Sequence, residues 1–278
     1  MITSMANGHI KQLRLLLEKS RARNREDLFV AEGIKMFAEA PVSKIREVYY
    51  AESFTPKALP EVQEKLRKCR EKGVLVEPVS DEVFQKTADT KTPQGILFVM
   101  EQMQYSMEIL VEKAVKRYTE GGREPLFLLL EDIQDPGNLG TMLRTGEGAG
   151  VDGVIMSRGT VDIYNPKTIR STMGSLYRVP FAYVEELADA IRLLQKNDIP
   201  VYAAHLRGER FFDELSYEGG SAFLIGNEGN GLKKETADLA DLYLKIPMEG
   251  KLESLNAAVA SALLLYQASG NSRRRRPE

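Results

Sequence analysis

Three short polar turns, each containing glycine and asparagine, constrain the fold of this chain more than any other feature. They lie at residues 135–140, 226–232 and 246–256. Each turn follows an apolar run of the length of a β-strand and precedes a helical pattern. In an open sheet of parallel strands, such turns gather at the carboxyl edge, where ligands bind. The pattern therefore predicts an α/β domain with a polar site at one edge of its sheet.

The second half of the chain alternates strand and helix. The run Leu126–Leu130 is apolar at every position, which is typical of a strand buried on both faces. Further strands are predicted at residues 153–156, 179–182, 200–204, 222–225 and 242–246, and helices at 138–148, 185–196, 233–239 and 254–268, with another opened by Asn165 and Pro166. This rhythm predicts a parallel sheet covered by helices on both faces.

The first half reads as a smaller α/β unit. Ile10, Leu13, Leu16 and Leu17 have helical spacing. Strands are predicted at residues 28–31, 48–51, 74–76 and 96–100, and helices at 34–40, 60–72 and 81–86. A polar stretch then leads to the first buried strand of the second half. We expect the boundary near residue 115, which gives domains at 1–115 and 116–278.

Composition argues against several kinds of site and location. Cys69 is the only cysteine, so no disulfide can form within the chain, and we predict no metal site. With His9 and His205 as the only histidines, a histidine-centred catalytic triad is not expected. The first residues lack the order of a signal peptide, and no apolar run approaches the length of a membrane span. We therefore expect a cytoplasmic protein without a membrane partner.

The first turn carries Asn138 and, six residues later, Arg144. Pro136 and Gly137 end the preceding strand, and Asn138 can cap the helix that follows. Capping alone would explain the asparagine. It would not explain Arg144, whose alternative interpretation is a surface arginine on an amphipathic helix.

In the second turn the order Gly-Asn-Glu-Gly-Asn-Gly starts at Gly226 and differs from a dinucleotide fingerprint. It places Glu228 where a pyrophosphate would need positive charge. This acid better suits a cationic ligand or hydroxyl donors. Glycine at position 226 allows the backbone to approach a ligand, so we expect a side chain there to occupy ligand space.

In the third turn Pro247 breaks the strand and Gly250 frees the loop, so that either Ser254 or Asn256 can cap the last helix. That helix has no charge between residues 257 and 265, which predicts burial on most sides. A cap accounts for one of these two polar residues and leaves the other available for a site.

A basic cluster lies between residues 11 and 25, with six cations against one acid. Such a cluster is either a solvated helix face or a set of phosphate contacts. The candidate RNA-binding residues are Lys19, Arg21, Arg23 and Arg25. For the run Arg273–Arg276 we favour a disordered end over an RNA-binding tail.

The three turns resemble the three motifs of the SpoU/TrmH class of RNA ribose methyltransferases, in the SPOUT superfamily. Residues 20–33 and the sequence Thr92-Pro93-Gln94-Gly95-Ile96 are similar to the opening and closing parts of the substrate-binding domain found in such enzymes. The two resemblances cover residues 11–268. The motifs of the second half are the more specific.

The resemblance implies a parallel-sheet SPOUT domain with a deep trefoil knot. It also implies a smaller N-terminal α/β domain related to ribosomal proteins that bind RNA. Family members are homodimers that use S-adenosylmethionine as methyl donor. The matching catalytic positions are Asn138, Arg144, Glu228, Ser254 and Asn256. The matching cofactor positions are Gly226, Gly231, Ile246, Met248 and Leu255, and Ala204 and His205 should border the same pocket as wall residues.

The expected function is therefore methylation of a ribose 2′-hydroxyl, with ribosomal RNA as the expected partner because of the separate N-terminal domain. Arg144 should stabilise developing alkoxide charge, because a guanidinium is very rarely deprotonated. The alternatives are a transfer-RNA ribose methyltransferase, an antibiotic-resistance methyltransferase, and an RNA-binding protein that no longer methylates. The sequence identifies neither the nucleotide nor the group that accepts the proton.

Overall fold

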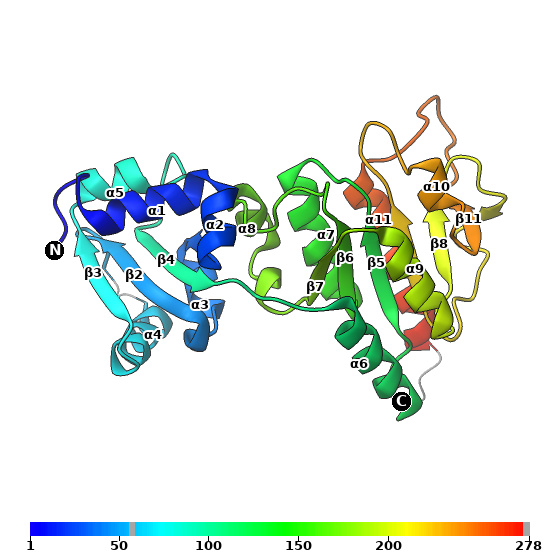
Figure 1. The fold of residues 1–278 in the computed structure, drawn as a ribbon, viewed down its shortest axis with the longest axis horizontal. Coiled ribbons are helices and arrows are strands. Elements are labelled where there is room, and N and C mark those ends of the chain that lie inside the picture. The colour runs from blue at the N-terminus through cyan, green and yellow to red at the C-terminus, as the bar shows by residue number, and fades with distance from the viewer. Residues whose placement is uncertain (56–58, 275–278) are drawn as a thin grey trace. The chain divides into compact units, whose positions relative to one another are not determined.

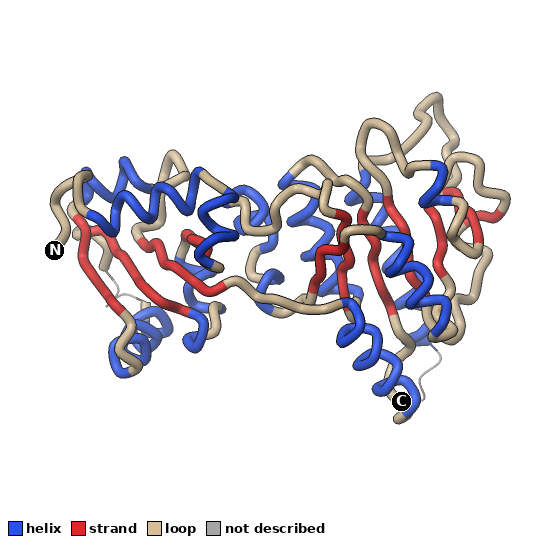
Figure 2. The backbone as a smooth tube through the Cα atoms, in the orientation of Figure 1, coloured by secondary structure: helices blue, strands red, loops and turns tan. Residues whose placement is uncertain are grey.

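The computed structural model describes residues 1–55 and 59–274, with side chains as far as residue 270. It consists of two compact units, each with its own sheet (Figures 1 and 2). The first unit contains Met1–Met103 and Asp162–Tyr177, and the second contains Gln104–Val161 and Arg178–Glu278. The boundary predicted near residue 115 lies within α6 (Met107–Thr119), which belongs to the second unit.

The first unit is built on a four-stranded sheet in the order β1-β4-β2-β3. Its strands are β1 (Leu28–Glu32), β2 (Ile45–Ala51), β3 (Leu75–Val79) and β4 (Ile96–Glu101). β4 runs antiparallel to both neighbours, whereas β2 and β3 are parallel. The four strands expected in this half are therefore present, each within a few residues of its predicted bounds.

Helices cover both faces of this sheet (Figure 1). They are α1 (Gly8–Glu18), α2 (Ser20–Glu26), α3 (Ile34–Glu39), α4 (Pro60–Glu71) and α5 (Asp81–Thr87), with η1 (Val42–Lys44) before β2. The predicted apolar face of α1 is confirmed, because Ile10, Leu13, Leu16 and Leu17 are all buried. They pack with Tyr49 and residues of α5 in one core.

The first unit also contains a segment from the second half of the sequence. This segment holds α8 (Pro166–Thr172) and η3 (Ser175–Tyr177), and α8 packs against β1. The predicted cap of α8 is confirmed, since the side chain of Asn165 accepts a hydrogen bond from the backbone N–H of Lys167 at 2.9 Å. The return of the chain to the first unit was not predicted, because it depends on contacts between residues far apart in sequence.

The second unit contains a seven-stranded, wholly parallel sheet in the order β7-β6-β5-β10-β8-β11-β9. Its strands are β5 (Leu126–Leu130), β6 (Gly153–Ser157), β7 (Phe181–Val184), β8 (Val201–Ala204), β9 (Arg210–Phe211), β10 (Ser221–Ile225) and β11 (Leu242–Lys245). All five residues of β5 are buried, as its sequence predicts. The two-residue strand β9 was not expected, because it is too short to give a pattern.

Two pairs of helices cover this sheet. α6 and α9 (Leu187–Lys196) pack in one core with inward residues of β5, β6, β8 and β10. α7 (Pro136–Ala149) and α11 (Ala257–Arg274) pack against each other, and α11 lies on β5 and β10. A short helix, α10 (Lys234–Ala237), precedes β11. The α/β fold class and the parallel sheet predicted from sequence are confirmed.

The backbone of Arg273 and Arg274 forms the end of α11, so the expected disordered end is wrong for these two residues. Arg275 and Arg276 lie outside the described residues. Among the described residues, no helix combines the length and the hydropathy that a membrane span requires.

Candidate active site

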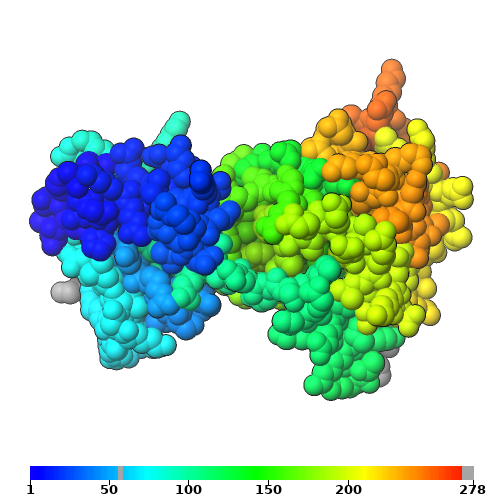
Figure 3. Space-filling model, viewed as in Figure 1, coloured from blue at the N-terminus to red at the C-terminus, as the bar shows by residue number. Residues whose placement is uncertain are grey.

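The three turns recognised in the sequence meet at the carboxyl edge of the second sheet. They follow β5, β10 and β11, and β10 pairs with both β5 and β8, while β8 pairs with β11. Parallel strands end at the same edge, so residues more than one hundred positions apart in sequence become neighbours. The loop after β11, in orange, projects from the surface of the second unit (Figure 3).

The first turn differs in one respect from the sequence-based expectation. α7 begins at Pro136, and its cap is Asp135, whose side chain accepts the backbone N–H of Asn138 at 2.8 Å. The alternative interpretation of Asn138 as the cap of this helix is therefore excluded. Proline at the first helical position and Asp135 before it start the helix two residues earlier. As a result, the side-chain amide of Asn138 is available for other contacts.

The amide of Asn138 joins the other two turns. Its Nδ2 donates to Oε1 of Glu228 at 3.0 Å. Its Oδ1 accepts from Nδ2 of Asn256, also at 3.0 Å. Glu228 belongs to the second turn and Asn256 to the third. A single hydrogen-bonded row thus connects one residue from each of the three motifs.

The chemistry at the two ends of this row fixes the orientation of both amides. An ionised carboxylate only accepts hydrogen bonds, so Asn138 must present its NH₂ group to Glu228 and its oxygen to Asn256. Asn256 therefore presents its own oxygen to the start of α11. There Oδ1 accepts from the backbone N–H groups of Ala258 at 2.9 Å and Val259 at 3.3 Å. Of the two candidate caps of the last helix, the structure uses Asn256.

Glu228 is bound by several donors besides Asn138. Its Oε2 accepts the backbone N–H of Gln134 at 3.0 Å, and its Oε1 accepts that of Asp135 at 3.1 Å. Partial burial alone would raise the pKa of this carboxyl. The hydrogen bonds from Asn138, Gln134 and Asp135 outweigh burial and hold the pKa below its ordinary value. Glu228 is thus an ionised structural acceptor, which makes it a weak proton acceptor.

Arg144 has the opposite environment. It is exposed on α7, six residues after Asn138. Within the described part of the chain its guanidinium has no hydrogen bond or ion pair. An exposed, unpaired guanidinium has all its donors available for an anionic ligand such as a phosphate.

A cleft of about 730 Å³ lies between the second and third turns. Every residue predicted to border the cofactor lines it: Ala204, His205, Gly226, Gly231, Ile246, Met248 and Leu255. Glu228 and Ser254 also line it, whereas Asn138, Arg144 and Asn256 do not. Most of its walls are apolar, and Glu249 and Glu253 add negative charge at the third turn. Within the described residues, no group of three or more His, Cys, Asp or Glu side chains could hold a metal ion.

Comparison with known proteins identifies the family. The model of the SpoU rRNA Methylase family matches residues 125–266, and the model of an MRM3-like substrate binding domain matches residues 7–97. A Bacillus subtilis protein named 23S rRNA (guanosine(2553)-2'-O)-methyltransferase RlmP is 30% identical over 271 residues, which are 97% of this chain and 99% of that protein. The chain belongs to the SpoU rRNA methylase family.

Two further relatives agree with this assignment. The 23S rRNA (guanosine-2'-O-)-methyltransferase RlmB of Xylella fastidiosa is 30% identical over 83% of this chain and 90% of that protein. The crystal structure of an AdoMet-bound rRNA methyltransferase from Sinorhizobium meliloti has a TM-score of 0.84 and 28% identity, and covers 99% of this chain and 98% of that one. The family resemblance predicted from the three turns is confirmed.

The structure gives a second reason for glycine at position 226 of this SpoU family member. A Cβ atom placed there would lie 2.2 Å from the carbonyl carbon of Gly231 and 2.3 Å from the nitrogen of Leu232. The two ends of the turn approach each other too closely for any side chain. A side chain at this position would therefore clash with the backbone of the turn. That it would also occupy ligand space stays a prediction, and Gly226 does line the cleft.

His205 is a wall residue, as predicted. Its ring lies 4.8 Å from that of Tyr243, measured between centroids, and its Nδ1 accepts the backbone N–H of Arg207 at 3.0 Å. These contacts hold the ring at the end of β8. They explain the position of His205 without a catalytic role.

One predicted RNA contact is wrong. Arg23 is only 3% exposed. Its guanidinium donates to Oδ2 of Asp162 at 2.6 and 2.9 Å and to the backbone carbonyls of Leu16 and Leu17. Arg23 is therefore a structural residue of the first unit. Lys19, Arg21 and Arg25 are exposed, and Arg25 pairs with Glu26 at 2.7 Å.

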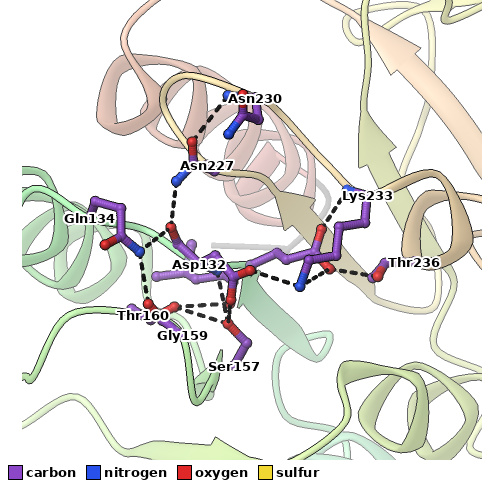
Figure 4. Close-up of polar contacts among 11 residues, drawn as sticks. Asp132, Gln134, Ser157, Gly159, Thr160, Asn227, Asn230, Lys233 and Thr236 are labelled. Carbon is purple, nitrogen blue, oxygen red and sulfur yellow. Dashed lines mark hydrogen bonds and ion pairs between the residues drawn. The ribbon is translucent and has the colours of Figure 1, made fainter.

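Sequence reasoning also missed a polar cluster beside the site (Figure 4). It is centred on Glu131 and Asp132, which directly follow β5, and includes Ser157 and Lys233. Glu131 and Asp132 follow the predicted strand directly and match none of the three motifs. The signal in the sequence is the position of Glu131 directly after a strand predicted to be buried, because a buried acid normally has specific partners. In the structure Glu131 is 3% exposed.

Proposed function

We propose that this SpoU family member transfers a methyl group from S-adenosylmethionine to a ribose 2′-hydroxyl of ribosomal RNA. The observation that carries this proposal is the row formed by Glu228, Asn138 and Asn256 beside the cofactor-sized cleft, with the unpaired cation of Arg144 on α7. The names of the Bacillus and Xylella relatives support ribosomal RNA as the substrate.

The cleft suits S-adenosylmethionine in volume and in chemistry. Pockets for ligands of this size typically measure about 300–1,000 Å³ and are mostly apolar with a few polar groups. Ile225, Leu244 and Leu255 offer apolar surface to an adenine ring and a methionine chain. Glu249 and Glu253 offer negative charge to the ammonium and sulfonium groups. When bound, the cofactor supplies an activated methyl group.

The protein must then align a ribose oxygen and stabilise the charge that develops on it. Arg144 is suited to this task, because its planar donors can bind a phosphate and an oxyanion together. Glu228 is suited to positioning, since its hydrogen bonds favour the ionised form and already use both oxygens. Ser254 at the cleft wall is the remaining candidate to contact the ribose.

Mapping of 2′-O-methyl groups in ribosomal RNA tests this function. We expect one site to be methylated when RNA from cells lacking the protein is incubated with the chain and S-adenosylmethionine. The Arg144→Ala variant is the control and should leave the site unmodified. Modification of transfer RNA alone, or of no RNA despite cofactor binding, would contradict the proposal.

We also propose a homodimer that uses an exposed apolar stripe on α11. Val259, Leu263 and Tyr266 are 48%, 38% and 47% exposed and follow one another at helical spacing. The hydroxyl of Tyr266 lies over Gly148 of α7, 2.6 Å from where a Cβ would stand. Gly148 is one turn from Arg144, so the stripe adjoins the face of α7 that carries the free arginine. A second copy covering this stripe would place Arg144 near a partner's cleft.

Mixed dimers test that arrangement. Arg144→Ala and Ala204→Phe, which fills the cleft wall, should each be inactive as homodimers. Their mixture should regain activity, because one site would combine an intact arginine with an intact cleft. Light scattering of a Val259→Asp variant should show loss of the dimer. No rescue in verified mixed dimers would argue against sharing of the site between subunits.

The deep trefoil knot, the division into functional domains at 1–115 and 116–278, and cytoplasmic localisation remain proposals. Family membership supports the knot, and the two separate sheets support two domains. Ribosomal RNA as substrate supports the cytoplasm.

A further inference from the structure

The turn that carries Glu228 is held at its far end by the polar cluster shown in Figure 4. We propose that Lys233 and Asp132 form a positioning pair for methyl transfer, which keeps Glu228 and therefore Asn138 in place. This inference rests on the proposed function. Neither residue lines the cofactor cleft, so the pair would act through the turn and not through direct contact with the cofactor.

Glu131 attaches the end of the turn to β5. Its Oε2 accepts the backbone N–H of Lys233 at 2.8 Å, and its Oε1 accepts the hydroxyl of Thr236 at 2.6 Å. Lys233 stands just before α10 and makes no side-chain cap of its own. A carboxylate from another segment thus satisfies the first N–H of that short helix.

Asp132 redirects the chain between β5 and the first turn. Its backbone is left-handed, with φ of 52°, which few residues other than glycine, asparagine and aspartate adopt readily. Its carbonyl accepts the side-chain amides of Asn227 at 2.8 Å and Gln134 at 2.9 Å. This bend leads directly to the backbone N–H groups of Gln134 and Asp135 that bind Glu228.

The Asp132 side chain is held from two sides. Oδ1 accepts the hydroxyl of Ser157 at 2.7 Å, and Oδ2 lies 2.8 Å from Nζ of Lys233. Hydrogen bonds to Lys233 and Ser157 lower the pKa of Asp132. Nζ of Lys233 is also 4.0 Å from Glu131. Lys233 therefore offsets two adjacent carboxylates that would otherwise repel each other next to Glu228.

Gly159 lies next to the carboxylate of Asp132. A Cβ atom at this position would lie 2.1 Å from Oδ1 of Asp132. The carboxylate therefore occupies the space that any other residue would fill. Gly159→Ala should displace Asp132 without removing a charge and without touching the turn at 226–232.

The main experiment compares Lys233→Met with Lys234→Met. Lys234 is the neighbouring lysine, is 82% exposed, and pairs with Asp238 instead of Asp132. We expect Lys233→Met to lower kcat by roughly tenfold to a hundredfold, since small misplacement of reacting groups has effects of that size. KM for S-adenosylmethionine should change less than threefold. Lys233→Arg should restore most of kcat, and Lys234→Met should leave kcat within twofold.

A double-mutant cycle shows whether the two residues act as one unit. Asp132→Asn keeps the left-handed backbone and removes the charge. If the pair positions the turn, the double variant with Lys233→Met should be no slower than the slower single variant. Gly159→Ala should resemble Asp132→Asn. Additive effects, or a kcat for Lys233→Met equal to that of Lys234→Met, would overturn the proposal.

Hydrogen exchange supplies a readout that does not need activity. The N–H groups of Gln134 and Asp135 should exchange about tenfold faster in Lys233→Met than in Lys234→Met, because both donate to Glu228. Unchanged exchange would overturn the positioning pair. If the parent protein methylates no ribosomal RNA, the proposed function fails, whereas exchange still decides whether the pair holds the turn.

Discussion

Arg23 in the first unit and Arg144 in the second lie in opposite environments, although the sequence predicted a ligand contact for both. Arg23 is buried and bound to Asp162 and to two backbone carbonyls. Arg144 is exposed and has no partner among the described residues. Sequence assigned ligand binding to both, and the structure leaves that role available to Arg144 alone.

The difference teaches how to separate structural from functional cations. A buried guanidinium must satisfy its donors within the protein, so Arg23 supports the fold of the first unit. An exposed guanidinium gains little from isolated surface pairing and can be kept free for a ligand. The same distinction separates Arg23 from Lys19, Arg21 and Arg25, which lie near it in sequence and are exposed.

The largest effect should come from removing the buried cation. Arg23→Ala leaves Asp162 and two carbonyls without their donor and should lower the free energy of unfolding by about 3–5 kcal/mol. Arg21→Ala, an exposed neighbour, should change it by less than about 0.5 kcal/mol. Urea unfolding followed by circular dichroism measures both. If the two variants had equal free energies of unfolding, Arg23 would not be a structural residue.

Removal of the free cation should instead affect catalysis. Arg144→Ala should lower methyl transfer by about 10²–10³-fold, while unfolding and cofactor binding change little. Arg144→Lys should also be impaired, because an ammonium lacks the planar set of donors. Transfer of labelled methyl groups to ribosomal RNA measures the rate. Arg158→Ala, an exposed arginine of the same unit paired with Glu185, is the control. Full activity of Arg144→Ala would refute the catalytic assignment.

A smaller effect is expected from the exposed cations near Arg23. Replacing Lys19, Arg21 and Arg25 by alanine should weaken RNA binding roughly tenfold and lower the slope of log affinity against log salt by about 2–3. These residues would contact phosphates and so affect position without sequence preference. Calorimetry should show unchanged affinity for S-adenosylmethionine. An unchanged salt slope would show that RNA binds elsewhere.

The smallest effect concerns the acid of the row and its dependence on pH. At neutral pH, Glu228→Gln should lower the free energy of unfolding of the second unit by about 1 kcal/mol, because hydrogen bonds to an ionised acceptor are lost. The pKa of Glu228 lies below its ordinary value of 4.5, so its contribution is present above that value and lost as pH falls through the folded pKa. The difference between parent and variant should therefore shrink below pH 4.5. Glu209→Gln, at an exposed position, should show no such trend.

Much of the fold was predictable because its elements have local signals. The continuous apolar run of β5, the helical spacing in α1 and the Asn165–Pro166 start of α8 each depend on neighbouring residues alone. The start of α7 was misjudged by two residues, because Asp135 and Asn138 are both good caps. The local signal that ranks them is Pro136, which favours the first helical position as Pro166 does in α8. The strand β9 has too few residues for a pattern.

The sequence by itself determined the order of strands and helices, the three turns and the family, because these depend on local periodicity and on short motifs. Only the tertiary structure decided which polar residues act together. Glu228, Asn138 and Asn256 are joined by hydrogen bonds into one row. Arg23 forms an ion pair with Asp162, and Lys233 forms one with Asp132. These pairs are separated by more than eighty residues along the chain, and a contact over that distance arises from strand order, which local sequence does not encode.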